Sequence, residues 1–297
     1  MQYAIATSQP FSFDQTIAFV RRFPAVQGDY VVRDDAISAA VAVDGKPIAF
    51  TLRSRGTELV VETTSRRVVK LAADFVGASD DIARLYAIAE GDPPFRAIVK
   101  QLYGLHHVRF LTLGEIAVYT VMMQRAPINV AAAYKRRFLE RFGLPIEIEH
   151  QTLHAMPELA TLAGLAGEQI GQAIGHRTKG ERIAEVVHGV AALGETWVRE
   201  APYAEARDAL RAIPGIGPFS AAAILLRGLG RMDELPAHRN FEEAGRAVYG
   251  AAFDPAKIVA RYGTSIGYWA FYVMAAEGRR RSPMAVAATR GPLRSAA

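Results

Sequence analysis

The pattern of hydrophobic and polar positions changes once along the chain, close to residue 65. Before that point, the capping-box pattern Ser-Phe-Asp-Gln at residues 12–15 opens a helix whose apolar side chains are Ile17, Val20 and Phe23. Three β-type segments follow, and they cover residues 37–43, 47–52 and 58–63. The first part of the chain therefore predicts a small antiparallel sheet with helices on one face.

From residue 66 onward, helical periodicity replaces the strand pattern, and we predict no further strand. The predicted helices cover residues 66–76, 80–90, 95–103, 114–123, 130–142, 156–164, 170–175, 179–193, 203–212, 219–228, 241–249 and 255–275. On helix 130–142, Lys135, Arg136 and Arg137 are expected to form one solvated basic face. The sequence thus predicts an α+β domain at residues 1–100, an all-α body at 101–282 and a flexible tail at 283–297.

Composition narrows the class of protein. With 297 residues, 51% of them hydrophobic, the chain can form one large or two ordinary domains with an ample core. Its 35 Lys and Arg against 30 Asp and Glu give a net charge of +5, which is compatible with a polyanionic partner but does not require one. Cysteine is absent, which excludes disulfides, thiolate zinc sites, cysteine nucleophiles and a cluster held by four cysteines.

The first fifteen residues lack the basic and apolar regions of a signal peptide. Charged residues or glycine interrupt every apolar stretch well before the 18 or so residues that a membrane span needs. We therefore expect a cytoplasmic protein without membrane contact, associated with the nucleoid if it binds DNA.

Two adjacent histidines, His106 and His107, lie beside Arg109. Neighbouring positions do not share one face of a helix, so the pair is poorly placed to bind one metal ion together. A surface position or a contact with phosphate is the favoured role.

The segment 210–222, Leu-Arg-Ala-Ile-Pro-Gly-Ile-Gly-Pro-Phe-Ser-Ala-Ala, is the most informative part of the sequence. Pro214 and Gly215 end one amphipathic helix, and Gly217 allows a tight turn before a second helix begins near Phe219. Such a turn presents backbone N–H groups at a helix N-terminus with no side chain in the way, which suits a phosphate. A plain corner between two structural helices is the alternative for the turn taken alone.

This segment resembles the hairpin of the helix-hairpin-helix DNA glycosylase superfamily, and other segments resemble its alkyl-purine branch, DNA-3-methyladenine glycosylase II. Residues 111–143, with Met123-Gln124-Arg125, are similar to the helix–loop–helix with which the family reaches the minor groove. Residues 174–180, Ile-Gly-His-Arg-Thr-Lys-Gly, resemble the Gly-x-x-x-Lys turn between these two motifs. The N-terminal sheet looks like the small α+β domain of that branch.

The resemblance implies several contacts with double-stranded DNA. Residues in or next to the hairpin would contact the DNA backbone, namely Pro214, Gly215, Ile216, Gly217 and Ser220. From the helix–loop–helix, Gln124 and Arg125 would help to fill the gap that a flipped base leaves. A monovalent cation bridging to phosphate could bind at the carbonyl groups of Arg211, Ile213 and Ile216, and the resemblance implies no required cofactor.

Phe219 falls where lyase-capable members of the family carry a Schiff-base lysine. A phenyl ring cannot form an imine, so the resemblance implies a monofunctional glycosylase that leaves an abasic site.

The family's catalytic aspartate lies about twenty residues past the hairpin, and counting from Leu235-Pro236 places His238 at this position. A neutral His238 could act as general base for water, but it cannot supply the negative charge that stabilises a developing sugar cation. Glu242, one helical turn later, could pair with His238. Asp233 is the alternative if the register shifts by a few residues, and His238 could also simply cap the helix or contact phosphate.

The alkyl-purine branch typically sandwiches a flipped base between aromatic rings. At the matching positions this chain has Phe219, Ala223, Met274 and Ala275, so one ring is retained. Trp269 is the aromatic residue that we expect to complete a base pocket with Phe219 and Met274, although Tyr268, Phe271 and Tyr272 lie near it. A place in the hydrophobic core is the alternative for this aromatic run.

Together these features predict a monomeric, monofunctional DNA glycosylase that excises alkylated purines of the 3-methyladenine type from damaged duplex DNA. A protein of another class, a catalytically weak or inactive damage-binding protein on the same scaffold, is the main alternative, because of His238 and the missing pocket rings. A helical structural protein unrelated to DNA is the third.

Overall fold

The computed structural model describes residues 1–55, 58–235 and 239–281. Its N-terminal part is a five-stranded antiparallel sheet with the strand order β1-β5-β4-β3-β2. The strands are β1 (Gln2–Ile5), β2 (Val31–Val32), β3 (Ala36–Val43), β4 (Lys46–Arg55) and β5 (Glu58–Thr63). The three predicted strands are confirmed, whereas β1 and β2 were missed because they are too short to show an alternating pattern.

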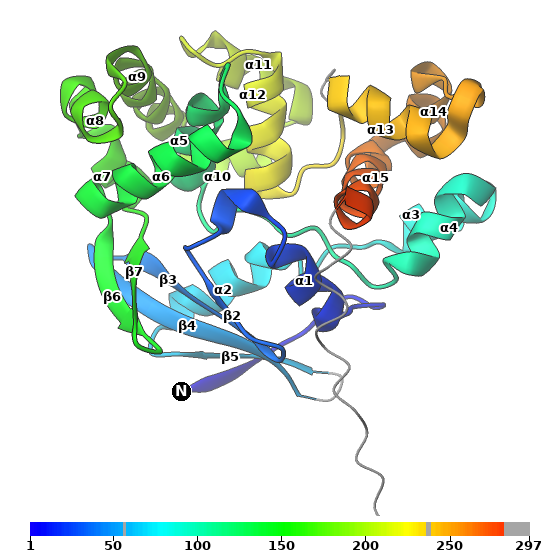
Figure 1. Cartoon of the computed structure of the whole chain (residues 1–297), viewed down its shortest axis with the longest axis horizontal. Helices are drawn as coiled ribbons and strands as arrows, with labels where there is room; N and C mark the ends of the chain where they lie inside the picture. Colours follow the sequence, from blue (N-terminus) through cyan, green and yellow to red (C-terminus); the bar gives the residue numbers. More distant parts are fainter. Residues whose placement is uncertain (56–57, 236–238, 282–297) are drawn as a thin grey trace, which may run out of the picture.

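Two helices lie between this sheet and the helices of the body (Figure 1). Helix α1 (Phe13–Val20) begins where the capping pattern predicts, since the hydroxyl of Ser12 accepts a hydrogen bond from the backbone N–H of Gln15 at 3.3 Å. Helix α2 (Arg66–Phe75) buries one apolar face, formed by Val68, Ala72 and Phe75. A short 3-10 turn, η1 (Pro24–Val26), follows α1 and leads toward β2.

The body is not all-α, because a β-hairpin of β6 (Leu144–Ile148) and β7 (Gln151–Ala155) covers the outer face of the N-terminal sheet. Its turn is Glu149-His150, both with positive φ, and it lacks the Gly or Asn-Gly signal of a two-residue hairpin. Covered on both faces, β3 is buried at all eight positions.

The helices of the body pack in two groups. One group shares a core with the sheet and consists of α5 (Leu113–Met123), α6 (Ile128–Phe142), α7 (Leu159–Ala163), α8 (Gly167–Ile174), α9 (Arg177–Leu193), α10 (Glu195–Glu200), α11 (Tyr203–Ala212) and α12 (Pro218–Ala223). The other has a core of its own and consists of α3 (Ala83–Glu90), α4 (Pro93–Gln101), α13 (Arg239–Tyr249), α14 (Pro255–Tyr262) and α15 (Ile266–Arg281). In the part of the chain that the structure describes, no helix is long and apolar enough to cross a membrane.

Two predicted helices differ in detail, and α10 was not predicted. The helix expected at 219–228 consists of α12 and a π-helical turn, η2 (Ile224–Gly228), which continues it. The helix expected at 255–275 is interrupted at Gly263, where φ is +49° and a short 3-10 turn separates α14 from α15. The domain boundary at residue 100 stays a prediction, and the predicted tail at 283–297 lies outside the described residues.

The basic face predicted on α6 is wrong for one of its members. Arg136 and Arg137 are exposed, but the Lys135 side chain is only 3% exposed. Its ammonium donates to the carboxylates of Glu115, at 2.6 Å, and Asp29, and to the carbonyl of Ala25 at 2.9 Å. Burial opposes the charge of Lys135, but the two carboxylates outweigh it and raise the pKa of this lysine. Lys135 therefore joins α5 and α6 to the segment after α1.

Candidate functional site

The turn between α11 and α12 is held by buried side chains on its inner side, and its backbone is exposed to solvent on its outer side. Ile213 and Ile216 are buried, and Gly189 of α9 leaves the space into which Ile213 packs. Gly215 has a φ of +90°, and a Cβ there would lie 2.7 Å from the Cγ of Arg182. Gly217 is exposed in an extended conformation, with open space where a Cβ would be. The backbone around Gly217 is thus accessible, as the sequence predicts for a phosphate-binding turn.

The loop after α5 is fastened to this turn through one side chain. The amide of Gln124 donates to the carbonyl of Gly215 at 2.8 Å and to the hydroxyl of Ser220 at 3.3 Å. Arg182 donates in turn to the side-chain oxygen of Gln124 at 3.4 Å. The structure therefore brings together three of the predicted DNA-contacting residues. Arg125, next to Gln124, is exposed and has a positive φ of 51°.

The Gly-x-x-x-Lys turn at residues 175–179 stabilises the same loop, the one after α5, through hydrogen bonds. Gly175 ends α8 in the left-handed conformation, and the ring of His176 caps α9 by accepting from the backbone N–H of Lys179. The Lys179 ammonium donates to three carbonyl groups at the end of α5, those of Val121 (3.1 Å), Met122 (3.3 Å) and Gln124 (2.6 Å). A cation at a helix C-terminus is favourable there. Burial and then Arg182 lower the pKa of Lys179.

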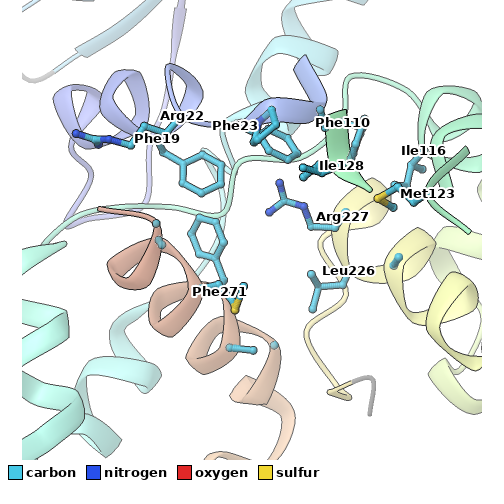
Figure 2. Close-up of a pocket in the computed structure, with 18 of the residues that line it drawn as sticks. Phe19, Arg22, Phe23, Phe110, Ile116, Met123, Ile128, Leu226, Arg227 and Phe271 are labelled. Atoms are coloured by element: carbon cyan, nitrogen blue, oxygen red, sulfur yellow. The ribbon is translucent and has the colours of Figure 1, made fainter. Parts of the chain in front are cut away.

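A cavity of about 510 Å³ begins beside the turn and extends toward the N-terminal part of the chain (Figure 2). Helices α1, α5, α12, α13 and α15, with the π-helical turn η2, supply most of its wall. Seven aromatic residues line it, namely Phe19, Phe23, Phe110, Tyr119, Phe219, Phe241 and Phe271. The charged residues of its wall are Arg22, Arg227 and Arg279, and among the described residues no aspartate or glutamate belongs to it.

Arg227 is the central charged group of this wall. Its guanidinium lies 4.4 Å from the ring centre of Phe23, 5.6 Å from that of Phe19 and 5.9 Å from that of Phe271. Figure 2 shows it among these rings. One nitrogen donates to Nε2 of His107 at 3.2 Å. Burial lowers the pKa of Arg227 to about 10, so the side chain keeps its charge at neutral pH.

The two histidines are buried, so the surface position predicted for them is wrong. His106 is held by the carbonyls of Gly77 and Pro10, at 2.6 and 3.0 Å. Burial, then the charges of Arg227 and Arg109, lower the pKa of His107 well below its usual value, which keeps the ring neutral. No group of three metal-ligating side chains occurs in the described ranges.

No family model matches the sequence. A Mycobacterium tuberculosis protein named "Probable bifunctional transcriptional activator/DNA repair enzyme AlkA" is 31% identical over 150 residues, and the Bacillus subtilis "DNA-3-methyladenine glycosylase" is 27% identical over 166 residues. These alignments cover 49% and 54% of this chain, which spans only 29% and 54% of the two relatives. The solved structure of a "3-methyladenine dna-glycosylase from Archaeoglobus fulgidus" covers 94% of this chain and 99% of its own, with a TM-score of 0.78 and 20% identity.

The chain has the fold of this solved glycosylase, and about half of it is similar in sequence to the two relatives. Two of the three residues predicted for a glycosylase base pocket, Phe219 and Met274, line the cavity. Trp269 does not, because it points to the opposite side of α15 and is fully buried in the second core. There it stacks on Phe253 and donates to the hydroxyl of Tyr249 at 3.0 Å. Phe271 is the member of that aromatic run that the cavity contains.

The structure describes only part of the catalytic position predicted from the resemblance. His238 lies outside the described residues. Glu242 is exposed on α13, and its neighbour Phe241 reaches the cavity. Asp233, the alternative, is half-buried beside Glu234, which pairs with Arg207 at 2.5 Å. The cation was predicted to bind at the carbonyl groups of Arg211, Ile213 and Ile216. Of these, the carbonyl of Ile213 already accepts a hydrogen bond from the backbone N–H of Ile216 at 3.0 Å.

The sequence did not predict the part of the cavity wall that comes from the N-terminal segment. Phe19, Arg22 and Phe23 line the cavity from about 200 residues away, and at helical spacing they look like ordinary core and surface positions. Arg227 had a weak signal, because it is a charged residue within the apolar segment that follows the hairpin.

Proposed function

We propose that this protein is a monofunctional DNA glycosylase that flips a damaged purine from duplex DNA into the cavity and hydrolyses its N-glycosidic bond. The observation that carries the proposal is the connection between three parts of the site. Gln124 joins the loop after α5 to the hairpin at Gly215, and Phe219, two residues beyond the hairpin glycines, lines the cavity. A base leaving the duplex near the hairpin would therefore find the cavity within reach.

Each part has a role in this proposal. Backbone N–H groups at Gly215 and Gly217 bind phosphate without reading sequence, whereas the N–H of Ile216 is used by the carbonyl of Ile213. A monovalent cation at the carbonyl of Ile216 is an additional bridge. The exposed Arg125 takes the gap left by the flipped base, since the amide of Gln124 is used within the protein. Alkylated purines are the lesion class for which two of the similar proteins are named. The protein acts as a monomer on cellular DNA. It is therefore placed in the cytoplasm, in association with the nucleoid.

The proposed chemistry is hydrolysis. The bond from C1′ of the sugar to the base nitrogen breaks, the electron pair goes to the base, and water adds to C1′ as it loses a proton. An uncharged base such as hypoxanthine takes up a proton as it leaves, whereas a cationic N3- or N7-alkylated purine becomes neutral with the electron pair alone and the proton of the water is released. His238 serves as the general base for this water, with Glu242 as its partner. Phe219 cannot form an imine with the sugar, so the product is an abasic site.

A damage-binding protein without catalysis is the second candidate function. It is favoured by one observation, namely that the described part of the cavity wall contains no carboxylate that could stabilise a developing sugar cation.

Single-turnover excision separates the two functions. Duplexes carrying 3-methyladenine, 7-methylguanine or hypoxanthine are incubated with wild type, His238→Ala and Glu242→Gln, with Glu243→Gln as the matched exposed control on the same helix. Release of base that falls at least about a hundredfold in His238→Ala, and not in Glu243→Gln, supports the glycosylase. Tight binding to an abasic analogue without release of any base supports the damage-binding protein.

A further inference from the structure

We propose that Arg227 makes the cavity selective for uncharged bases that carry a carbonyl oxygen, and unfavourable for bases that carry a positive charge. The inference rests on the proposed function and names the lesion class of the same site. It departs from the lesion class that the names of the relatives suggest, because N3- and N7-alkylated purines are cations while they remain attached to the sugar.

The charge of Arg227 is not neutralised by the protein. No carboxylate of the described residues forms an ion pair with it, and its polar partner is the neutral ring of His107. Arg109, whose charge also acts on His107, is by contrast paired with Asp80. A guanidinium in an apolar cavity without a counter-charge attracts electron-rich atoms and repels cations.

The geometry of the guanidinium selects the kind of acceptor. Arginine has five N–H donors in a planar fork, and His107 accepts from one nitrogen only. A carbonyl oxygen in the plane of a stacked base can accept hydrogen bonds from the remaining N–H groups of the guanidinium. An adjacent ring nitrogen with a lone pair can do the same. Tyr119 also lines the cavity, and its buried hydroxyl has no hydrogen-bond partner in the described structure.

The aromatic rings do not reverse this preference. Phenyl faces attract cations, and such faces would ordinarily stabilise a cationic base. Here Phe19, Phe23 and Phe271 are already placed around the guanidinium of Arg227. Two other arginines, Arg22 and Arg279, add to the positive charge of the wall. An uncharged base can stack on the remaining rings without meeting this repulsion.

A purely structural role for Arg227, holding α1 against η2 through its ring contacts, predicts a different result. Removing a structural residue would impair all substrates in parallel, whereas removing a selecting charge would change the two substrate classes in opposite directions. The test therefore measures a ratio of rates.

The experiment compares single-turnover excision of hypoxanthine and of 3-methyladenine by wild type and Arg227→Met. We expect hypoxanthine release to fall at least about tenfold and 3-methyladenine release to stay level or rise, because the variant loses both a hydrogen-bond donor and a repelling charge. Arg231→Met is the matched control, because Arg231 also contacts a ring, that of Tyr203, and a carbonyl, that of Val198, but does not line the cavity. A parallel loss on both substrates, or an unchanged ratio, would overturn the inference.

A second measurement uses the wild-type protein alone and keeps the inference testable if Arg227→Met does not fold. In calorimetric titrations, free hypoxanthine should bind at least about tenfold more tightly than free adenine, which lacks the carbonyl oxygen. Equal affinities would reject the role of Arg227.

The outcomes also separate this inference from the proposed function. If charged purines are excised and the ratio does not respond to Arg227→Met, the glycosylase stands and the selectivity fails. If no duplex is cleaved or bound, the proposed function fails, and the preference for free hypoxanthine over adenine still tests the cavity by itself.

Discussion

At the scale of single residues, the interior of this protein holds several charged and titratable groups whose states are set by their neighbours. Lys135 is charged between two carboxylates, whereas His107 is neutral beside Arg227 and Arg109. Both were taken for surface residues, since a lysine or a histidine in an amphipathic sequence is usually solvated. Their burial depends on partners from other elements, which the local pattern does not contain.

The neutral state of His107 predicts how stability depends on pH. The unfolded chain binds a proton at this histidine near pH 6.5, and the folded chain does not, so acid favours unfolding. We expect the free energy of unfolding to fall between pH 6.5 and 5 by up to about 1.4 kcal/mol per pH unit from this residue. His107→Gln, which keeps an acceptor for Arg227, should flatten the decline in urea unfolding curves.

His188→Gln serves as the control for this measurement, because His188 is exposed on α9. An identical pH slope in wild type and His107→Gln would show that His107 does not govern the acid sensitivity.

At the scale of elements, the hairpin separates residues that support the fold from residues that leave room for a ligand. Gly215 needs its positive φ and the absence of a Cβ, whereas Gly217 has ordinary dihedral angles and open space around it. An unneeded glycine costs conformational entropy on folding. A glycine at position 217 is therefore explained by what approaches it, and in the proposed function this is a DNA phosphate.

Alanine substitutions at the two glycines should have different effects. Gly215→Ala should lower the free energy of unfolding by about 1–3 kcal/mol, because an alanine is strained at this positive φ and its Cβ would meet Arg182. Gly217→Ala should change stability by less than about 0.5 kcal/mol. Even so, it should weaken binding to a duplex with an abasic analogue by about tenfold, because a methyl group keeps the phosphate away from the backbone.

Denaturation curves and fluorescence-anisotropy titrations of both variants give the two quantities. Unchanged DNA affinity in Gly217→Ala would mean that the hairpin does not contact the phosphates as proposed.

At the scale of the whole molecule, the sheet and the helices are not independent. A single core contains Ile37 and Leu52 of the sheet together with Val118 of α5 and Val187 of α9. The second core joins α3 and α4 to α13 and α15, although more than 130 residues separate these pairs along the chain. The two ends of the helical part are therefore stabilised by each other.

This shared packing predicts one cooperative unfolding transition. We expect far-ultraviolet and near-ultraviolet circular dichroism to give the same midpoint in urea, because neither core can lose its N-terminal residues and keep its shape. Two separated transitions would instead indicate that residues 1–100 and the body fold as separate units.

Local patterns predicted the elements better than they predicted the site. Ser12, the turn Asp44-Gly45 between β3 and β4, and the Pro214–Gly217 segment have strong signals, because the chemistry of a cap or a turn lies within a few residues. The hairpin β6–β7 was missed because its turn residues, Glu149 and His150, are unusual in the left-handed conformation. The cavity was predicted at Phe219, Ala223, Met274 and Ala275, but most of its remaining wall assembles from elements that meet only in the folded chain.

The attachment of the segment after α1 bears on how such a protein can change during evolution. Phe23, Pro24 and Ala25 form part of the cavity wall, and Lys135 ties this segment to α5 and α6 through Ala25 and Asp29. The hairpin at 213–217 is made entirely from another part of the chain. In the proposed function, substitutions in the first thirty residues can therefore reshape the cavity that receives the base, while the contacts of the hairpin with the DNA backbone stay unchanged.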